Sequence, residues 1–330
     1  MKTIENMKNI AANRVNPRNL TINFQLINGF ASLLPKRILQ YSIAVLFILF
    51  IGNTSFGQAV GDYRSNAATM NWNADASWQI CTSLAPVTWA TVTTEGYPGE
   101  LGISGTVTIR DGHTVTITAN IPNALSNLVV GEGISGILTT NNGDRIINIT
   151  NNLSVNVGGT YNVNRSVLTV GGTTTIAGTL SDENNNGTNT FTGKVTLTGS
   201  GSFTTTAVTT AGRLVFRNGL EQNSSGTFSA GIATFNTNNQ SIQINNNTGN
   251  VSFANAVLVN KNLTLLNGGD GTGAGNLIFS GNLTLGTNTS VTNQRSTLIN
   301  GVLTGTDATS IWNNFASASS ILYYANATQP

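Results

Sequence analysis

The phrase Asn127-Leu128-Val129-Val130 recurs, with small changes, four more times before residue 304. The other copies are Asn152-Leu153-Ser154-Val155, Asn262-Leu263-Thr264-Leu265, Asn276-Leu277-Ile278-Phe279 and Asn282-Leu283-Thr284-Leu285. In each copy apolar residues flank one variable position, which is the period-two pattern of a short β-strand with one buried face. The repeated phrase therefore predicts a stack of short strands.

The spacing of the copies indicates how the strands are arranged. The intervals from Asn127 to Asn152 and from Asn262 to Asn282 both fall in the range of solenoid coils. Similar strand-like segments recur between them and are bounded by Gly or Asn. We therefore predict an all-β fold, a right-handed parallel β-helix of about eight to ten coils over residues 127–330. A β-sandwich or barrel is the competing fold, but the strands are very short and hairpin signals are sparse.

Asparagine at the head of a strand has two possible physical uses in such a stack. It tolerates the left-handed conformation at a corner, and its side chain can form hydrogen bonds along the ladder.

Composition and charge exclude some functions. Charged residues make up only 8% of the chain, against roughly 25% in ordinary domains. From residue 58 onward, nine Lys and Arg residues stand against twelve Asp and Glu residues, a net charge of −3. Nucleic-acid binding needs clustered basic side chains, so we expect no nucleic-acid partner.

Residues 1–57 have the pattern of a secretory signal peptide with an extended n-region. Lys36-Arg37 precede an apolar run at residues 43–51, and small residues follow it up to Gly57. The run is too short for a membrane anchor, which needs about 20 apolar residues. We expect a signal helix, cleavage near Gly57 or Gln58, and no membrane span in the mature protein.

Residues 58–126 form a tryptophan-rich unit that we expect to be an N-terminal β cap. Asp111-Gly112 stands between two alternating segments, at residues 106–109 and 114–118, and predicts a β-hairpin. Matching apolar faces requires a three-residue loop with Gly112 left-handed and Val107 opposite Val115. His113 then flanks the turn beside Ile109 and has a structural role. The single cysteine, Cys81, is expected to be buried as a small hydrophobic residue.

This unit resembles the opening of flavobacterial-type secreted surface proteins. The similarity lies in Gly61-Asp62-Tyr63-Arg64-Ser65, the pair Trp72 and Trp78, Tyr97-Pro98-Gly99, and Asp111-Gly112-His113-Thr114-Val115-Thr116. It implies a large β-solenoid, exported as type IX secretion cargo and displayed on the cell surface or released. Such proteins usually end in a β-sandwich sorting domain, and nothing after Thr304 resembles one. We therefore expect the chain to be a fragment.

Trp72, Trp78 and Trp89 are the candidate binding residues. Exposed aromatic rings can stack on sugars, so the three could form a carbohydrate platform. The alternative, which we favour, is that they plug the first coil and cover its apolar end.

Other chemical motifs favour structural interpretations. Asp182-Glu183 are adjacent in a polar loop, where two carboxylates rarely face one another across a substrate. Residues 268–273 are similar to a calcium-binding nonapeptide, but Gly273 replaces the required Asp. Threonine patches at residues 114–116, 173–175 and 204–206 could bind ice, but the intervals between them are unequal and show no constant coil register. We expect no catalytic residues, no metal and no cofactor.

The sequence thus predicts a non-catalytic, secreted or cell-surface structural or adhesive protein whose solenoid acts as a shaft. The alternative is a carbohydrate-binding or polysaccharide-active β-helix. Expected partners are surface glycans or matrix polysaccharide, and we expect a monomer on a bacterial surface or in the medium.

Overall fold

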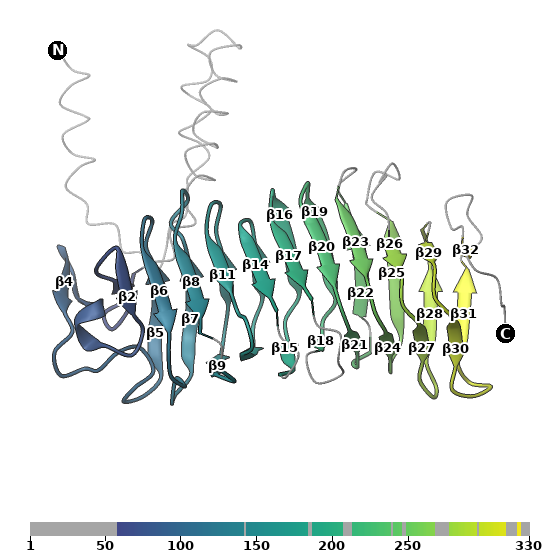
Figure 1. Cartoon of the computed structure of the whole chain (residues 1–330), viewed down its shortest axis with the longest axis horizontal. Coiled ribbons are helices and arrows are strands. Elements are labelled where there is room, and N and C mark those ends of the chain that lie inside the picture. Colours follow the sequence, from purple (N-terminus) through teal and green to yellow (C-terminus); the bar gives the residue numbers. More distant parts are fainter. Residues whose placement is uncertain are drawn as a thin grey trace, which may run out of the picture. The chain divides into compact units, whose positions relative to one another are not determined.

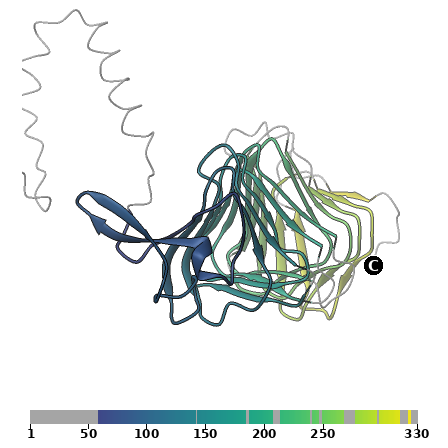
Figure 2. The same cartoon turned by 60° about the vertical axis from the view of Figure 1, so that its left-hand side comes forward.

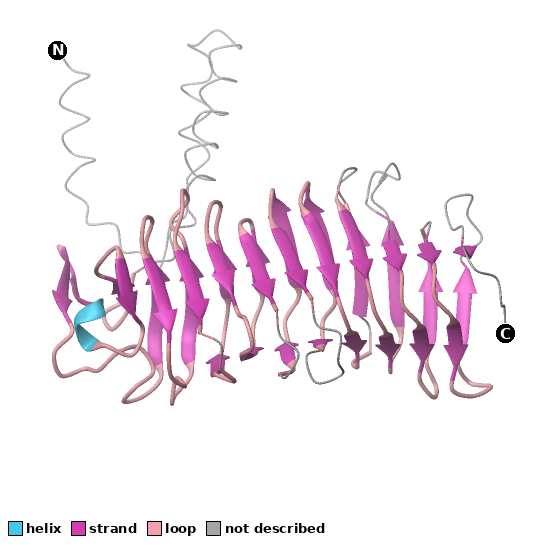
Figure 3. Ribbon diagram, in the orientation of Figure 1, coloured by secondary structure: helices cyan, strands magenta, loops and turns pink. Residues whose placement is uncertain are grey.

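The computed structural model describes residues 58–330 apart from 142, 184–186, 207–212, 239, 246–248, 268–276, 296, 315–321 and 325–330. The expected signal peptide therefore lies outside the described residues. Short strands stack along one long axis, and one 3-10 turn is the only helical element among these residues (Figures 1 and 3). None of the described segments is a helix of the length and apolarity needed to cross a membrane. The predicted all-β parallel β-helix is confirmed.

The strands fall into three parallel ladders, named here in the order in which the chain visits them. The first ladder contains β1 (Tyr63–Ser65), β5 (Ser104–Ile109), β7 (Leu125–Val130), β10 (Leu153–Val155), β13 (Thr174–Ile176), β16 (Val195–Gly199), β19 (Leu220–Ser224), β22 (Gln240–Ile244), β25 (Leu263–Asn267), β28 (Ser290–Asn293) and β31 (Ile311–Asn314). The second ladder contains β2 (Thr69–Asn71), β6 (Thr114–Ile117), β8 (Ile137–Thr140), β11 (Thr160–Asn162), β14 (Thr179–Asp182), β17 (Ser202–Thr205), β20 (Thr227–Ala230), β23 (Asn250–Phe253), β26 (Leu277–Phe279), β29 (Thr297–Ile299) and β32 (Leu322–Tyr324). The third ladder contains β9 (Ile146–Ile149), β12 (Val167–Val170), β15 (Asn189–Phe191), β18 (Leu214–Phe216), β21 (Ala233–Phe235), β24 (Val257–Val259), β27 (Leu283–Leu285) and β30 (Leu303–Gly305).

Inward-facing apolar residues set the register between coils. Leu128 of β7 pairs with Leu153 of β10, which pairs with Thr174 of β13, so each interval between partners is one coil. Both leucines are fully buried, and each contributes about 1.5–3 kcal/mol relative to an exposed side chain. A one-residue slip would turn each inward set toward solvent, so the stacking register is strongly specified.

Phenylalanines fill the middle of the core. Phe216 of β18 and Phe235 of β21 stack with ring centroids 5.2 Å apart. On the second ladder Phe228 of β20 contacts Phe203 edge-on at 5.4 Å and lies 5.5 Å from Phe253. The second and third ladders thus bring rings from distant parts of the sequence into one continuous apolar column.

The Asn-Leu phrase marks the start of a strand, and its asparagine bonds to the neighbouring coil. The Asn152 side-chain oxygen accepts hydrogen bonds from the backbone N–H and the hydroxyl of Thr173, both at 2.9 Å. Asn127 accepts the N–H of Asn152 in the same way, at 3.2 Å. The predicted bonding along the ladder is confirmed. The left-handed asparagines are instead Asn164 and Asn288, which lie outside the phrase.

One predicted repeat spacing is wrong. Asn262-Leu263 leads into β25 of the first ladder, whereas Asn282-Leu283 leads into β27 of the third. The interval between these two copies therefore joins two sides of the solenoid and is not a coil length. The phrase leads into strands of all three ladders, namely β7, β10 and β25 of the first, β26 of the second and β27 of the third, so it marks a strand and not one side of the solenoid.

The predicted hairpin around Asp111-Gly112 is also wrong. Val107 of β5 pairs with Leu128 in the first ladder, while Val115 of β6 pairs with Met70 and Leu138 in the second. Gly112 is left-handed as predicted, with a φ of 74°. The turn is a solenoid corner, because strands of adjacent coils satisfy both edges of β5 and β6. The ladders thus begin with β1 and β2, inside the range expected to form the cap.

A true hairpin interrupts the first coil. The 3-10 turn η1 (Asp75–Ser77) leads into β3 (Trp78–Leu84), which pairs antiparallel with β1 and with β4 (Val87–Thr91). The hairpin, dark blue in Figure 2, extends away from the stacked coils. Cys81 of β3 is buried, as predicted, and is a free cysteine without a disulfide.

Candidate functional site

Two of the three candidate tryptophans lie inside the first coil. Trp72 follows β2 and Trp78 begins β3, and neither has any exposed surface. Their rings pack edge to face with centroids 4.7 Å apart. The Trp78 indole N–H donates to the backbone oxygen of Trp72 at 2.8 Å, and the Trp72 indole N–H donates to that of Pro98 at 3.1 Å. With both faces and both polar atoms occupied, neither ring is available to stack on a sugar.

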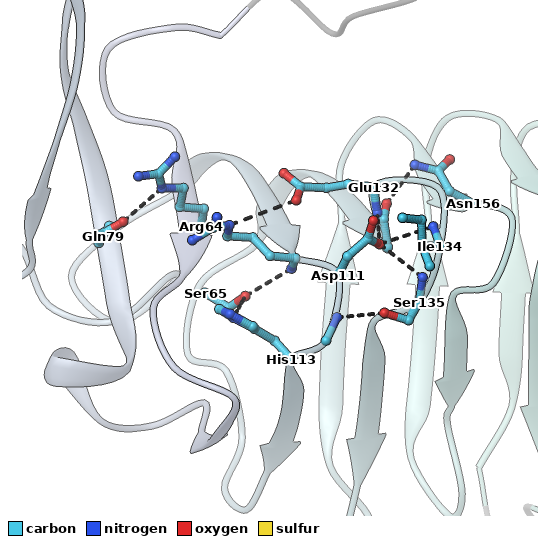
Figure 4. Close-up of polar contacts among 12 residues, drawn as sticks. Arg64, Ser65, Gln79, Asp111, His113, Glu132, Ile134, Ser135 and Asn156 are labelled. Carbon is cyan, nitrogen blue, oxygen red and sulfur yellow. Dashed lines mark hydrogen bonds and ion pairs between the residues drawn. The ribbon is translucent and has the colours of Figure 1, made fainter.

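Trp89 lies apart from this pair, on the projecting strand β4, and is half-exposed. The Arg64 guanidinium lies 4.3 Å from its ring centroid, and Arg64 Nε donates to Gln79 Oε1 at 2.8 Å (Figure 4). Burial, and then the charge of Arg110, lowers the pKa of Arg64. The structure therefore does not bring the three tryptophans together as one platform.

A pocket of about 520 Å³ opens beside the hairpin. Its walls include Tyr63, Tyr97, Ile80 and Leu101, with Glu95 at the edge. The Tyr63 hydroxyl donates to the backbone oxygen of Glu95 at 3.4 Å, and burial followed by the Glu95 charge raises the pKa of Tyr63. The lining mixes two tyrosine rings and aliphatic side chains with polar groups, including Ser104 and Glu95. Sequence reasoning missed it, because its walls come from separate segments, at 60–80 and 95–105, that no local motif connects.

Ser65 and His113 form a hydrogen-bonded pair between the first two coils (Figure 4). The Ser65 hydroxyl lies 2.8 Å from His113 Nδ1 and accepts the backbone N–H of Arg110 at 2.9 Å. Burial, followed by the charge of Arg110, lowers the pKa of His113, while Glu132 opposes the shift. A serine beside a histidine can serve as a nucleophile, but Ser65 is fully buried, so no substrate atom can reach it. His113 has the structural role predicted for it, with Ser65 as its partner rather than Ile109.

Asp111 bonds to the following coil and not to His113. Its Oδ1 accepts the backbone N–H groups of Glu132, Ile134 and Ser135 at 2.7, 3.3 and 3.0 Å. Burial alone would raise the pKa of Asp111, but the backbone N–H groups lower it by a larger amount. The pKa of Asp111 therefore lies below its ordinary value. Arg110 and Glu132 form an ion pair at 3.8 Å across the same corner. The cluster therefore fastens adjacent coils together.

Two candidate motifs remain, the carboxylate pair Asp182-Glu183 and the calcium-like stretch at residues 268–273. Asp182 is buried on β14 and accepts a hydrogen bond from the Asn189 amide at 2.6 Å, whereas Glu183 is exposed. The two carboxylates therefore do not share a site. The calcium-like stretch at 268–273 lies outside the described residues. In the part of the chain that is described, no three His, Cys, Asp or Glu side chains gather as metal ligands would.

Comparison of the chain with protein-family models, curated proteins and solved structures finds no match.

Proposed function

We propose that this protein is a secreted or cell-surface structural or adhesive protein whose solenoid acts as a non-catalytic shaft. One observation supports the proposal most. The second ladder runs through eleven strands in one direction, over a core filled with apolar side chains. Each coil contacts only its neighbours, so the stack forms a stiff rod whose length grows with coil number.

The surface chemistry supports the same role. The three ion pairs among the described residues are spread over the coils, and each involves partly exposed side chains. A neutral rod of amides and hydroxyls suits spacing and presentation outside the cell. The resemblance of residues 60–130 to flavobacterial-type surface proteins, with type IX export, adds to this argument.

Labelling of intact cells tests the proposal. Antibodies raised against the purified protein should label unlysed cells of the producing organism or detect the protein in the medium. External protease should remove that signal. Labelling that appears only after lysis contradicts surface exposure. Release of reducing ends from a panel of polysaccharides by the purified protein contradicts the non-catalytic role.

Carbohydrate binding is a second candidate, supported by the half-exposed Trp89 and the aromatic pocket beside the hairpin. Surface glycans or matrix polysaccharide would be the ligands. Trp89→Ala should lose binding on a glycan array, whereas Thr91→Ala on the same strand should retain it. Equal binding by both variants and the parent removes Trp89 from the proposal.

A further inference from the structure

The outward face of the second ladder carries two columns of uncharged and mostly small side chains. In each strand the residues on either side of the central inward residue point to the opposite, outer face, because side chains alternate along a β-strand. One column contains Thr69, Thr114, Ile137, Thr160, Thr179, Ser202, Thr227 and Asn250. The other contains Asn71, Thr116, Thr139, Asn162, Ser181, Thr204, Ser229 and Ser252. None of the sixteen is buried and none is charged.

These columns exist in space although the sequence hides them. The coil from Thr114 to Ile137 is longer than the coil from Thr160 to Thr179, yet each delivers its residue to the same column. The threonine patch at residues 173–175 belongs to β13 of the first ladder, whereas the other two patches lie on β6 and β17 of the second. The unequal intervals therefore compare different sides of the solenoid. The missing register, which argued against ice binding, is present in the structure.

The parallel ladder sets the geometry of the face. Neighbouring strands lie about 4.8 Å apart, and alternate residues along a strand lie about 6.6 Å apart, so the hydroxyls form a rectangular grid. Figure 1 shows the strands that carry it, β2 through β23, side by side along the long axis. Of the sixteen positions, twelve are Thr or Ser. The array ends where Ile278 and Leu298 occupy the outward positions of β26 and β29.

We propose that this face, the outward side of β2, β6, β8, β11, β14, β17, β20 and β23, binds ice. A crystal surface is itself a periodic array of hydrogen-bonding water. Hydroxyls repeated at fixed spacing can join it at many points at once, while threonine methyl groups restrict and order the first water layer. Charged groups would hold their own hydration shells, and this face carries none. The first ladder is less suitable, since it places Arg64 and Glu221 outward.

A crystalline polysaccharide is the competing periodic surface. Sugar-binding faces rely on aromatic rings that stack on the pyranose, and the sixteen positions include no aromatic residue. The observations therefore favour ice over polysaccharide as the ligand of this face.

Two matched double variants test the proposal. Thr160→Lys with Thr179→Lys puts charge on adjacent coils of the proposed face, where these residues are register partners. Thr175→Lys with Thr196→Lys makes the same change on adjacent coils of the first ladder. Both pairs consist of one exposed and one half-exposed threonine. Thermal hysteresis and inhibition of ice recrystallisation are measured for the protein expressed from the full chain, and circular-dichroism melts check that each variant is folded.

We expect hysteresis in the parent, its loss to the buffer level in the second-ladder variant, and its retention in the first-ladder variant. An inactive parent overturns the proposal. Equal loss in two folded variants, or full retention in the second-ladder variant, overturns it as well. In a separate arm the parent is sedimented with microcrystalline cellulose and chitin. Binding there that the second-ladder variant loses, without activity on ice, reassigns the face to polysaccharide.

Discussion

Truncating Phe228 to alanine tests how the solenoid is held together. The side chain is fully buried on β20, and its ring lies 5.4, 5.5 and 6.1 Å from those of Phe203, Phe253 and Phe216. Phe228→Ala removes the ring from the middle of the column, and a flanking ring cannot fill the space without leaving its own ladder position. We expect the free energy of unfolding to fall by about 3–5 kcal/mol.

Equilibrium urea unfolding followed by circular dichroism measures this loss, with Phe228→Leu as the control. The leucine keeps most of the apolar volume, so its cost should stay below about 1.5 kcal/mol. Hydrogen exchange then locates the damage. Because each coil contacts only its neighbours, protection should fall in β17, β20 and β23 and remain unchanged in β6 and β8. A loss below about 1 kcal/mol, or a uniform loss of protection across all coils, refutes the reasoning.

Three further changes test individual contacts. Asn152→Ala leaves the Thr173 N–H and hydroxyl without their acceptor, so the urea midpoint should shift by the equivalent of about 0.5–1.5 kcal/mol; an unchanged midpoint contradicts a stabilising role. His113 has a folded-state pKa below its ordinary 6.5, so the unfolded chain binds more protons beneath that value and stability is lost as the pH falls. The melting temperature of His113→Gln should therefore fall less than that of the parent from about pH 7 to about pH 5, and parallel curves would count against this coupling. Gly158→Ala would strain a φ of 74° and bring a Cβ onto the carbonyl oxygen of Ile134. Its free energy of unfolding, measured from thermal melts, should therefore fall by more than about 1 kcal/mol. An unchanged free energy of unfolding contradicts the close approach.

The sequence was sufficient to predict most strands of the three ladders because nearly all of them bury at least one apolar side chain, although β31 and the hairpin strand β4 bury none. Leu128, Leu153, Leu168 and Leu197 recur as inward residues, and the alternation around them can be read locally. The Asp111-Gly112 turn could not be assigned in the same way. A left-handed glycine after an aspartate serves a hairpin and a solenoid corner equally well, and what separates them is the partner of each strand, which lies a full coil away.

The candidate sites were hidden for a related reason. The aromatic rings of Trp72 and Trp78 are as easily exposed as buried on the evidence of spacing alone. Their burial follows from the antiparallel pairing of β3 with β1, which packs Trp78 against Trp72, and from the chain at Pro98, which accepts the Trp72 indole N–H. The Ser65–His113 pair joins two different coils, so no local motif could reveal it.

The hydroxyl columns explain why coil length is a poor guide to this class of surface. Inward packing fixes the register of each strand, whereas the corners absorb differences in length at small entropic cost. The coil from Ser202 to Thr227 is longer than the coil from Thr160 to Thr179, yet both deliver a small hydroxyl residue to the same column.

Strand propensity alone favours threonine on an outward position but also favours valine and isoleucine. In the first column of eight positions only Ile137 is a large apolar residue, although the third ladder accepts the half-exposed Val167 at a position that alternates with its inward residues. From β2 to β23 the second ladder thus carries only one of the large apolar side chains that the same ladder accepts further along at Ile278 and Leu298, and this restriction is what a surface-binding face requires and a plain shaft does not.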